Sequence, residues 1–304
     1  MGFYQPAQIV TDAKNHGVEF RPVDINYSDW DNLLEERSGK YYVVRLGFRH
    51  VKGLREEDIN LLISNRKTFY RSINELHDIN LSQAALEKLV DADAFRSIGL
   101  DRRQALWEIS TCNDRAVALF AGQDFTEPAE KKLSLPVMNL SEHVVQDFAS
   151  TSLSLKAHPV SFIREKLQQL RLVSTKELNN LQDGDLIKTA GLVLVRQRPG
   201  TAKGVVFITI EDETGTANLV LFPNIFDKYR KAILQSRLLM VEGKLQKEGE
   251  VIHVIVQQCF DLSRFLSHLF SSKTTNDFTR DLIQANGIQE AEQLTAFPSG
   301  RNFR

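Results

Sequence analysis

The sequence predicts an α+β protein in which an N-terminal helical region with a helix–hairpin–helix module precedes a small closed β-barrel. Two observations carry this prediction. Residues 43–118 read as consecutive short helices, whereas residues 183–262 read as five strands with one helix between the third and fourth. That β-β-β-α-β-β order is typical of a five-stranded Greek-key barrel of the OB type, which often holds single-stranded nucleic acid.

Three neighbouring acids lie at the end of the second predicted strand of the barrel. The segment Glu211-Asp212-Glu213 places three carboxylates side by side, which makes a metal site an alternative to a turn. Successive strand residues point to opposite faces, so these side chains converge poorly, and the following Thr214-Gly215 indicates a hairpin turn instead. The strands are expected at Leu186–Arg198, Gly204–Asp212, Thr216–Phe222, Arg237–Gln246 and Val251–Phe260, and the helix at Asn224–Gln235.

Ahead of the barrel the pattern changes to short helices. Ser82 precedes Leu86 and Leu89 and is a natural N-cap, so a helix is expected to begin there. Other helices are expected over residues 5–17, Arg55–Asn65, Asp101–Val117, Ser141–Phe148 and Pro159–Leu170, and a short strand over Tyr41–Leu46. The predicted parts are residues 1–42, a helix–hairpin–helix region at 43–120, a linker with packing helices at 121–180, the OB-fold domain at 181–264, and a tail at 265–304 whose last residues, 297–304, are expected to be disordered.

Bulk properties exclude several classes of protein. The chain has 304 residues, 42% hydrophobic and 25% charged residues, and a formal net charge of −1. Any binding of nucleic acid must therefore come from local basic patches. Cys112 and Cys259 lie too far apart for a metal motif, no segment reads as a signal peptide, and no apolar run approaches a membrane span. A cytoplasmic protein without a membrane partner is expected.

The first candidate site is the turn Val51-Lys52-Gly53-Leu54-Arg55. In a helix–hairpin–helix module, glycine lets the backbone approach a phosphate, and the N-terminus of the second helix adds partial positive charge. Residues 43–71 hold seven Lys or Arg against three Asp or Glu. We therefore expect Lys52, Gly53 and Arg55 to contact the DNA backbone, with a plain helical corner carrying solvated charges as the alternative.

The second candidate site is on the barrel. Arg196, Arg198 and Lys203 surround the first predicted β-turn, where OB barrels present a ligand-binding loop, and we expect them to contact phosphates. Phe207 and Phe222 lie in the second and third strands, where a ring can stack on a base. Either ring can instead belong to the core, and for each Phe taken alone that interpretation is favoured. Phe207 is still counted with Arg196, Arg198 and Lys203 among the candidate residues that guide a single-stranded template.

A third, weaker candidate lies on the linker. Leu119 and Phe120, close to Gln123 and Phe125, have the character of a short apolar peptide that docks on a sliding clamp. The alternative is a linker that carries two phenylalanines by chance.

In this order, these pieces resemble the C-terminal third of a bacterial C-family DNA polymerase of the polymerase III alpha type. Within that family the chain is most similar to the error-prone, damage-inducible paralogue often called ImuC. The resemblance rests on residues 1–10 (MGFYQPAQIV), 21–24 (RPVD), 51–54 (VKGL), 100–107 (LDRRQALW), 154–159 (SLKAHP), 191–204 (GLVLVRQRPGTAKG), 210–215 (IEDETG) and 301–304 (RNFR).

The resemblance implies template-directed DNA synthesis past lesions, by two-metal nucleotidyl transfer with Mg²⁺. In that family the catalytic aspartates belong to a palm domain, which a PHP domain precedes, and both would lie upstream of Met1. The resemblance also implies that residues 1–42 are the end of the fingers region. It assigns no catalytic residue and no cofactor to this chain, and it implies DNA, a sliding clamp and mutasome adaptor proteins as partners.

Two rival interpretations come from other classes. One is a stand-alone protein that binds single-stranded nucleic acid or acts as an adaptor. The other is an anticodon-binding barrel attached to a tRNA enzyme, against which the Val51–Arg55 hairpin argues.

Overall fold

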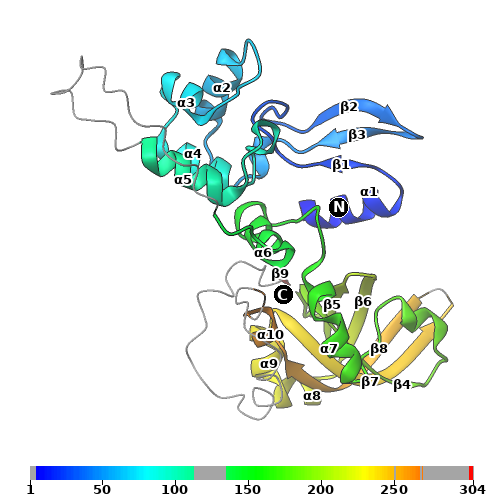
Figure 1. The fold of residues 1–304 in the computed structure, drawn as a ribbon. Coiled ribbons are helices and arrows are strands. Elements are labelled where there is room, and N and C mark those ends of the chain that lie inside the picture. The colour runs from blue at the N-terminus through cyan, green and yellow to red at the C-terminus, as the bar shows by residue number, and fades with distance from the viewer. Residues whose placement is uncertain (1–4, 113–134, 250, 268, 270–300, 304) are drawn as a thin grey trace, which may run out of the picture. The chain divides into compact units, whose positions relative to one another are not determined.

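The computed structural model describes residues 5–112, 135–249, 251–267, 269 and 301–303 (Figure 1). The chain forms two compact units. The first comprises residues 1–139 with 150–155, and the second comprises residues 140–149 with 156–304. The predicted clamp residues Leu119 and Phe120 lie outside the described residues. None of the described helices combines the length and the apolar character that crossing a membrane requires.

The first unit begins with a helix and a small sheet. After α1 (Pro6–Asn15), the strand β3 (Tyr41–Arg45) lies between β1 (Phe20–Arg21), with which it pairs in parallel, and β2 (Leu33–Ser38), with which it pairs antiparallel. The strand β3 confirms the prediction, whereas β2 was missed. Four of its six residues are charged or polar and four are exposed, so its sequence reads as a loop.

Short helices complete the first unit. A 3₁₀ turn at Phe48–His50 and the predicted hairpin lead into α2 (Glu56–Asn65). Ser82 caps α4 (Gln83–Asp91) as predicted, and its hydroxyl accepts a hydrogen bond of 3.2 Å from the Ala85 amide. One apolar core unites these elements, with Phe48, Leu62 and Leu86 fully buried. The helices are α2 (Glu56–Asn65), α3 (Ile73–Asp78), α4 (Gln83–Asp91) and α5 (Arg102–Cys112).

The second unit contains the predicted barrel (Figure 1, green to orange). Its strands follow the order β5-β6-β8-β7-β4, and β4 pairs with β5 to close the ring. All neighbours are antiparallel except β6 and β8, as a Greek-key OB barrel requires. Every strand boundary lies within two residues of the prediction: β4 (Leu186–Gln197), β5 (Val206–Asp212), β6 (Gly215–Leu221), β7 (Leu238–Glu248) and β8 (Val251–Asp261). The predicted helix is split into α8 (Pro223–Lys228) and α9 (Arg230–Gln235).

Two glycines permit the barrel to close tightly. A Cβ atom on Gly243 would lie 2.3 Å from the Ile255 carbonyl oxygen, and one on Gly191 would lie 2.6 Å from the Glu211 carbonyl oxygen. Gly243 also adjoins a β-bulge in the β7–β8 pair. Such close approaches between strands are available only to glycine.

Helices cover one side of the barrel and leave another open. α6 (Leu140–Thr151), α7 (Arg164–Gln169) and α10 (Arg264–Ser267) contribute to a second apolar cluster, which also contains Ala190 and Leu192 of β4 and Leu238 of β7. The outward residues Phe207 of β5 and Asn218 of β6 are instead exposed. The outer face of β5 and β6 is therefore accessible to a ligand.

The last strand corrects one prediction. Residues 297–304 were expected to be disordered, but β9 (Arg301–Phe303) pairs in parallel with Val195–Gln197 of β4. Three residues give no periodicity that a sequence pattern can reveal, so this prediction was wrong for residues 301–303.

Candidate nucleic-acid interface

The open face of the barrel presents an aromatic ring. Along β5, Val206 and Ile208 are 3% and 1% exposed, whereas Phe207 between them is 36% exposed, because alternate strand residues point to opposite faces. Phe207 lies opposite Gln197 of β4 and Val220 of β6. Phe222, which precedes α8, is 47% exposed. The favoured interpretation of both rings as core residues was wrong.

Polar groups continue this face beyond Phe207. Thr209 of β5 donates a hydrogen bond of 3.1 Å to the Asn218 side chain of β6, and Asn218 lies opposite His253 of β8. Sequence reasoning missed Asn218 and His253 because only the parallel β6–β8 pairing brings them together. A surface with one exposed ring and amide and imidazole groups suits an unpaired base.

The β4–β5 loop places two cations at one end of this face. The Arg198 guanidinium lies 4.9 Å from the centre of the Phe226 ring of α8, and Gly204 approaches Pro223 of the same helix. Lys203 is exposed and has a left-handed backbone with φ of 46°. Within the described structure, neither Arg198 nor Lys203 forms an ion pair, so both charges remain available to a phosphate.

Arg196 has a different role from the one predicted. It is 3% exposed, its Nε donates a hydrogen bond of 2.6 Å to the Ile233 carbonyl, and Nη2 donates to the Ser236 carbonyl. These carbonyls lie at the C-terminal end of α9, where helix acceptors lack backbone partners. A β-bulge between Val193 and Val195 shifts the alternation of β4. The prediction that Arg196 contacts DNA is corrected, because its guanidinium lies in the interior and satisfies a helix end.

The hairpin of the first unit keeps the predicted glycine turn before α2, but a 3₁₀ turn at Phe48–His50, and not an α-helix, precedes it. Val51 and Leu54 are buried, and they leave Lys52 and Gly53 exposed between them. Gly53 has a φ of 73°, which favours glycine, and Arg55 is the exposed N-cap residue of α2. The Lys52 amide donates a 2.8 Å hydrogen bond to the Ser150 carbonyl, so this amide is not available to a phosphate.

Charge at the hairpin is more balanced than the sequence count suggests. The three acids of residues 43–71 are Glu56, Glu57 and Asp58, and all occupy the first turn of α2, where a phosphate would approach. Three of the seven cations are paired with acids outside this range: Arg45 with Glu35, Arg49 with Asp31, and Arg66 with Asp29. The hairpin is therefore the weaker of the two predicted contacts.

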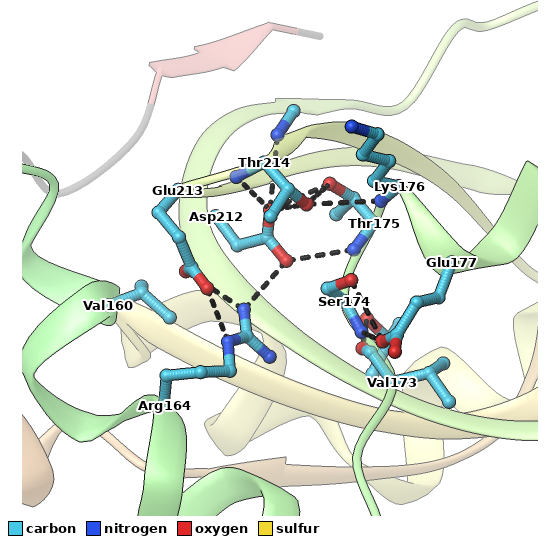
Figure 2. A network of polar contacts seen from close by, with 12 residues as sticks. Val160, Arg164, Val173, Ser174, Thr175, Lys176, Glu177, Asp212, Glu213 and Thr214 are labelled. Atoms are coloured by element: carbon cyan, nitrogen blue, oxygen red, sulfur yellow. Dashed lines mark hydrogen bonds and ion pairs between the residues drawn. The ribbon is translucent and has the colours of Figure 1, made fainter.

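Figure 2 shows a polar network that anchors the β5–β6 turn to the segment before the barrel. The Arg164 guanidinium of α7 forms ion pairs with Asp212, at 2.8 Å, and with Glu213. The Asp212 carboxylate also accepts hydrogen bonds from the amides and hydroxyls of Thr175 and Thr214. The predicted hairpin turn is confirmed, and the carboxylates of Asp212 and Glu213 form contacts that stabilise the fold around this turn.

The same network shifts three pKa values. Burial alone would raise the pKa of Asp212, but hydrogen bonds from Thr175 and Thr214 hold it below its ordinary value. Burial, with the Asp212 charge as a further cause, raises the pKa of Glu211 to about 7. Burial lowers the pKa of His158, whose Nε2 lies 3.9 Å from the Glu211 carboxyl group, to about 4.

Two family models match the chain. One, described as a helix-hairpin-helix motif, covers residues 17–105, and the other, described as an OB-fold nucleic acid binding domain, covers residues 187–262. The error-prone DNA polymerase of Brucella abortus biovar 1 (strain 9-941) is 45% identical over 307 residues, which cover 100% of this chain. Error-prone DNA polymerase 1 of Rhizobium meliloti (strain 1021) is 45% identical over 88% of this chain.

The chain belongs to the error-prone DNA polymerase family. It spans 28% of the length of the Brucella abortus polymerase and 26% of that of the Rhizobium meliloti polymerase. Among solved structures, asparaginyl-tRNA synthetase from Pyrococcus horikoshii is 26% identical over 30% of this chain and 23% of its own, with a TM-score of 0.27. The helix–hairpin–helix motif and the barrel together match the C-terminal, DNA-binding region that the sequence predicts for this family.

Proposed function

We propose that this region of an error-prone DNA polymerase guides the single-stranded template. The main observation in support is that the Phe207 ring is exposed on the open face of a barrel that matches a nucleic-acid-binding domain, near the exposed cations Arg198 and Lys203. An unpaired base would stack on Phe207 while its phosphates contact the two cations. Lys52, Gly53 and Arg55 would hold duplex backbone behind the primer end.

The activity of the whole polymerase is part of this proposal. We propose DNA synthesis past lesions in the bacterial cytoplasm, with Mg²⁺ at the catalytic aspartates of a palm domain and with a sliding clamp and mutasome adaptors as partners. Among the described residues no cluster of three His, Cys, Asp or Glu side chains could hold a metal ion. These residues do not fit the Mg²⁺ site, and we assign no catalytic residue to them.

The test is binding of a labelled 20-nucleotide single strand, followed by fluorescence anisotropy across a salt series. Each phosphate contact contributes about 0.7 to the slope of log Kobs against log salt concentration for single strands. We expect the double variant Arg198→Ala/Lys203→Ala to bind more weakly, with a slope reduced by about 1.4. The matched control Arg171→Ala/Lys176→Ala removes two exposed cations ahead of the barrel and should keep the wild-type slope.

Three results would contradict the proposal. An unchanged salt slope in Arg198→Ala/Lys203→Ala would show that the β4–β5 loop does not contact the DNA phosphates. Robust primer extension by this chain alone, with Mg²⁺ and nucleotides, would show that the catalytic groups lie within it. Preference for structured RNA over single-stranded DNA in competition would favour the anticodon-binding alternative.

A further inference from the structure

Two aromatic rings meet on the surface of the first unit. Tyr27 and Phe69 are 45% and 58% exposed, and their ring centres lie 5.2 Å apart at an interplanar angle of 49°. The two residues are 42 positions apart in the sequence, so a local pattern does not account for the pair. Exposed rings in contact with each other present more apolar surface than a scattered aromatic residue does.

A buried clamp fixes the two rings in place. The Asn26 side chain donates a 3.0 Å hydrogen bond to the Tyr70 carbonyl and accepts one of 2.8 Å from the Tyr70 amide. The Tyr70 hydroxyl donates to the Leu62 carbonyl, and both Asn26 and Tyr70 are buried. Tyr27 follows Asn26 in the sequence, and Phe69 precedes Tyr70. The Asn26–Tyr70 hydrogen bonds therefore hold the backbone next to both ring-bearing residues, which lowers the entropy cost of binding a ligand there.

A cation further restrains the Tyr27 ring. The Arg45 guanidinium lies 5.1 Å from the ring centre and is itself held by Glu35 and by the Pro22 carbonyl. This cation–π contact limits the movement of an otherwise exposed side chain. Tyr27 is thereby oriented before any ligand arrives.

Cations flank Phe69 in the sequence. Residues 59–74 contain Arg66, Lys67 and Arg71 and no acid, and Glu75, whose carboxylate accepts a hydrogen bond of 3.3 Å from the Arg71 amide, follows directly. Arg66 anchors the segment through Asp29 and through the carbonyls of Ile25 and Ser28. Lys67 and Arg71, on either side of Phe69, are exposed and form no ion pair with any described residue. Exposed rings flanked by such cations match the two needs of a single strand, which are stacking and phosphate neutralisation.

We propose that Tyr27, Phe69, Lys67 and Arg71 form a second contact for single-stranded DNA, separate from the barrel face. An unpaired base stacks on the Phe69–Tyr27 pair, and the neighbouring phosphates contact Lys67 and Arg71. The ligand is an unpaired strand because a base within a duplex does not expose its flat surface. An apolar peptide is less suited, since two cations border the rings. The inference rests on the proposed function only for the choice of DNA as the ligand.

The experiment measures binding of the whole chain to a 12-nucleotide deoxythymidylate and to a matching strand with one 2-aminopurine. We expect Phe69→Ala to weaken binding by about 5- to 100-fold, the range that loss of one stacked base gives. Phe69→Leu, which keeps an apolar side chain but removes the ring, should weaken binding in the same direction and restore the 2-aminopurine emission that stacking quenches. Lys67→Ala/Arg71→Ala should lower the salt slope by about 1.4.

The controls separate this contact from the barrel and from general damage to the fold. Trp107→Ala removes another ring of the same unit, which is 50% exposed, and should bind as the wild type does. In a Phe207→Ala background the factor lost on Phe69→Leu should be unchanged, because separate contacts contribute independently. Failure of the wild type to bind DNA would overturn both proposals. Wild-type binding with unchanged affinity and emission in Phe69→Leu would overturn this one alone and assign the rings to a protein partner.

Discussion

At the scale of single residues, Arg196 stabilises the barrel and does not contact the ligand. Replacing it by Met keeps much of the apolar stem but leaves the Ile233 and Ser236 carbonyls without their donor. Unsatisfied buried acceptors cost about 1–3 kcal/mol each, so we expect Arg196→Met to lower the free energy of unfolding by about 2–4 kcal/mol. Urea denaturation would measure the loss.

Arg198 provides the comparison for Arg196. Its guanidinium is exposed and stacks on Phe226, so Arg198→Met should cost only about 0.5–1 kcal/mol of stability while weakening DNA binding. The opposite result would be an Arg196→Met protein that is as stable as the wild type but binds DNA more weakly. It would show that Arg196 contacts DNA.

The Glu211–His158 pair predicts how stability depends on pH. The pKa of Glu211 is raised from 4.5 to about 7, so its stabilising contribution is complete below pH 4.5 and is lost as the pH rises through 7. The pKa of His158 is lowered from 6.5 to about 4, so its neutral form is favoured and stability increases as the pH rises from 4 to 6.5. The two trends oppose each other between pH 4.5 and 6.5.

Glu211→Gln removes one of these trends, because glutamine resembles the protonated acid. We expect the variant to equal the wild type near pH 4.5 and to exceed its free energy of unfolding at pH 8 by roughly 3 kcal/mol. Urea denaturation from pH 4.5 to 8 measures the difference. Asp227→Asn, at an exposed carboxylate of α8, should show no such divergence. Equal pH profiles for Glu211→Gln and the wild type would show that Glu211 ionises normally in the folded protein.

At the scale of elements, the β7–β8 pair requires a glycine at position 243. A Cβ atom on Gly243 would lie 2.3 Å from the Ile255 carbonyl oxygen of β8, and a backbone cannot move aside as a side chain can. We expect Gly243→Ala to lower the free energy of unfolding by at least about 3 kcal/mol. Gly200→Ala, in the open β4–β5 loop with no atom within 4 Å, should change stability by less than about 0.5 kcal/mol. Equal midpoints of thermal unfolding for the two variants would contradict the tight closure.

The barrel could be predicted from sequence because local signals define its elements. Turn residues separate its strands, and Thr214-Gly215 marks the hairpin between β5 and β6. The strand β2 was missed because its residues are mostly charged, and β9 because three residues carry no pattern. Element type follows from local chemistry, whereas short or polar strands exist only because a partner strand pairs with them.

The site could be predicted only in part. The loop cations and Phe207 were found from their positions in the barrel order, but exposure at Phe207 depends on which side of the barrel the helices cover. The interior position of Arg196 follows from a β-bulge and a helix end, both set by tertiary structure. The Tyr27–Phe69 pair depends on the Asn26 clamp across 44 positions of sequence.

At the scale of the whole molecule, the two units have separate cores. The buried cluster of the first unit runs from Val10 to Leu153, and it shares no residue with the barrel cluster, which runs from Leu178 to Cys259. Both tryptophans of the chain, Trp30 and Trp107, belong to the first unit. Tryptophan emission therefore reports unfolding of the first unit, whereas the loss of far-ultraviolet circular dichroism reports both.

Separate cores predict that damage to one unit leaves the other intact, because apolar burial stabilises only the unit that contains it. We expect Gly243→Ala to shift part of the circular dichroism transition to lower temperature and to leave the midpoint of tryptophan emission unchanged. Leu62→Ala, in the core of the first unit, should do the reverse, lowering the emission midpoint by several degrees for a loss of about 2–5 kcal/mol. A Gly243→Ala protein whose emission midpoint falls together with its circular dichroism would show that the two units unfold as one, in which case the barrel would stabilise the unit that carries the hairpin.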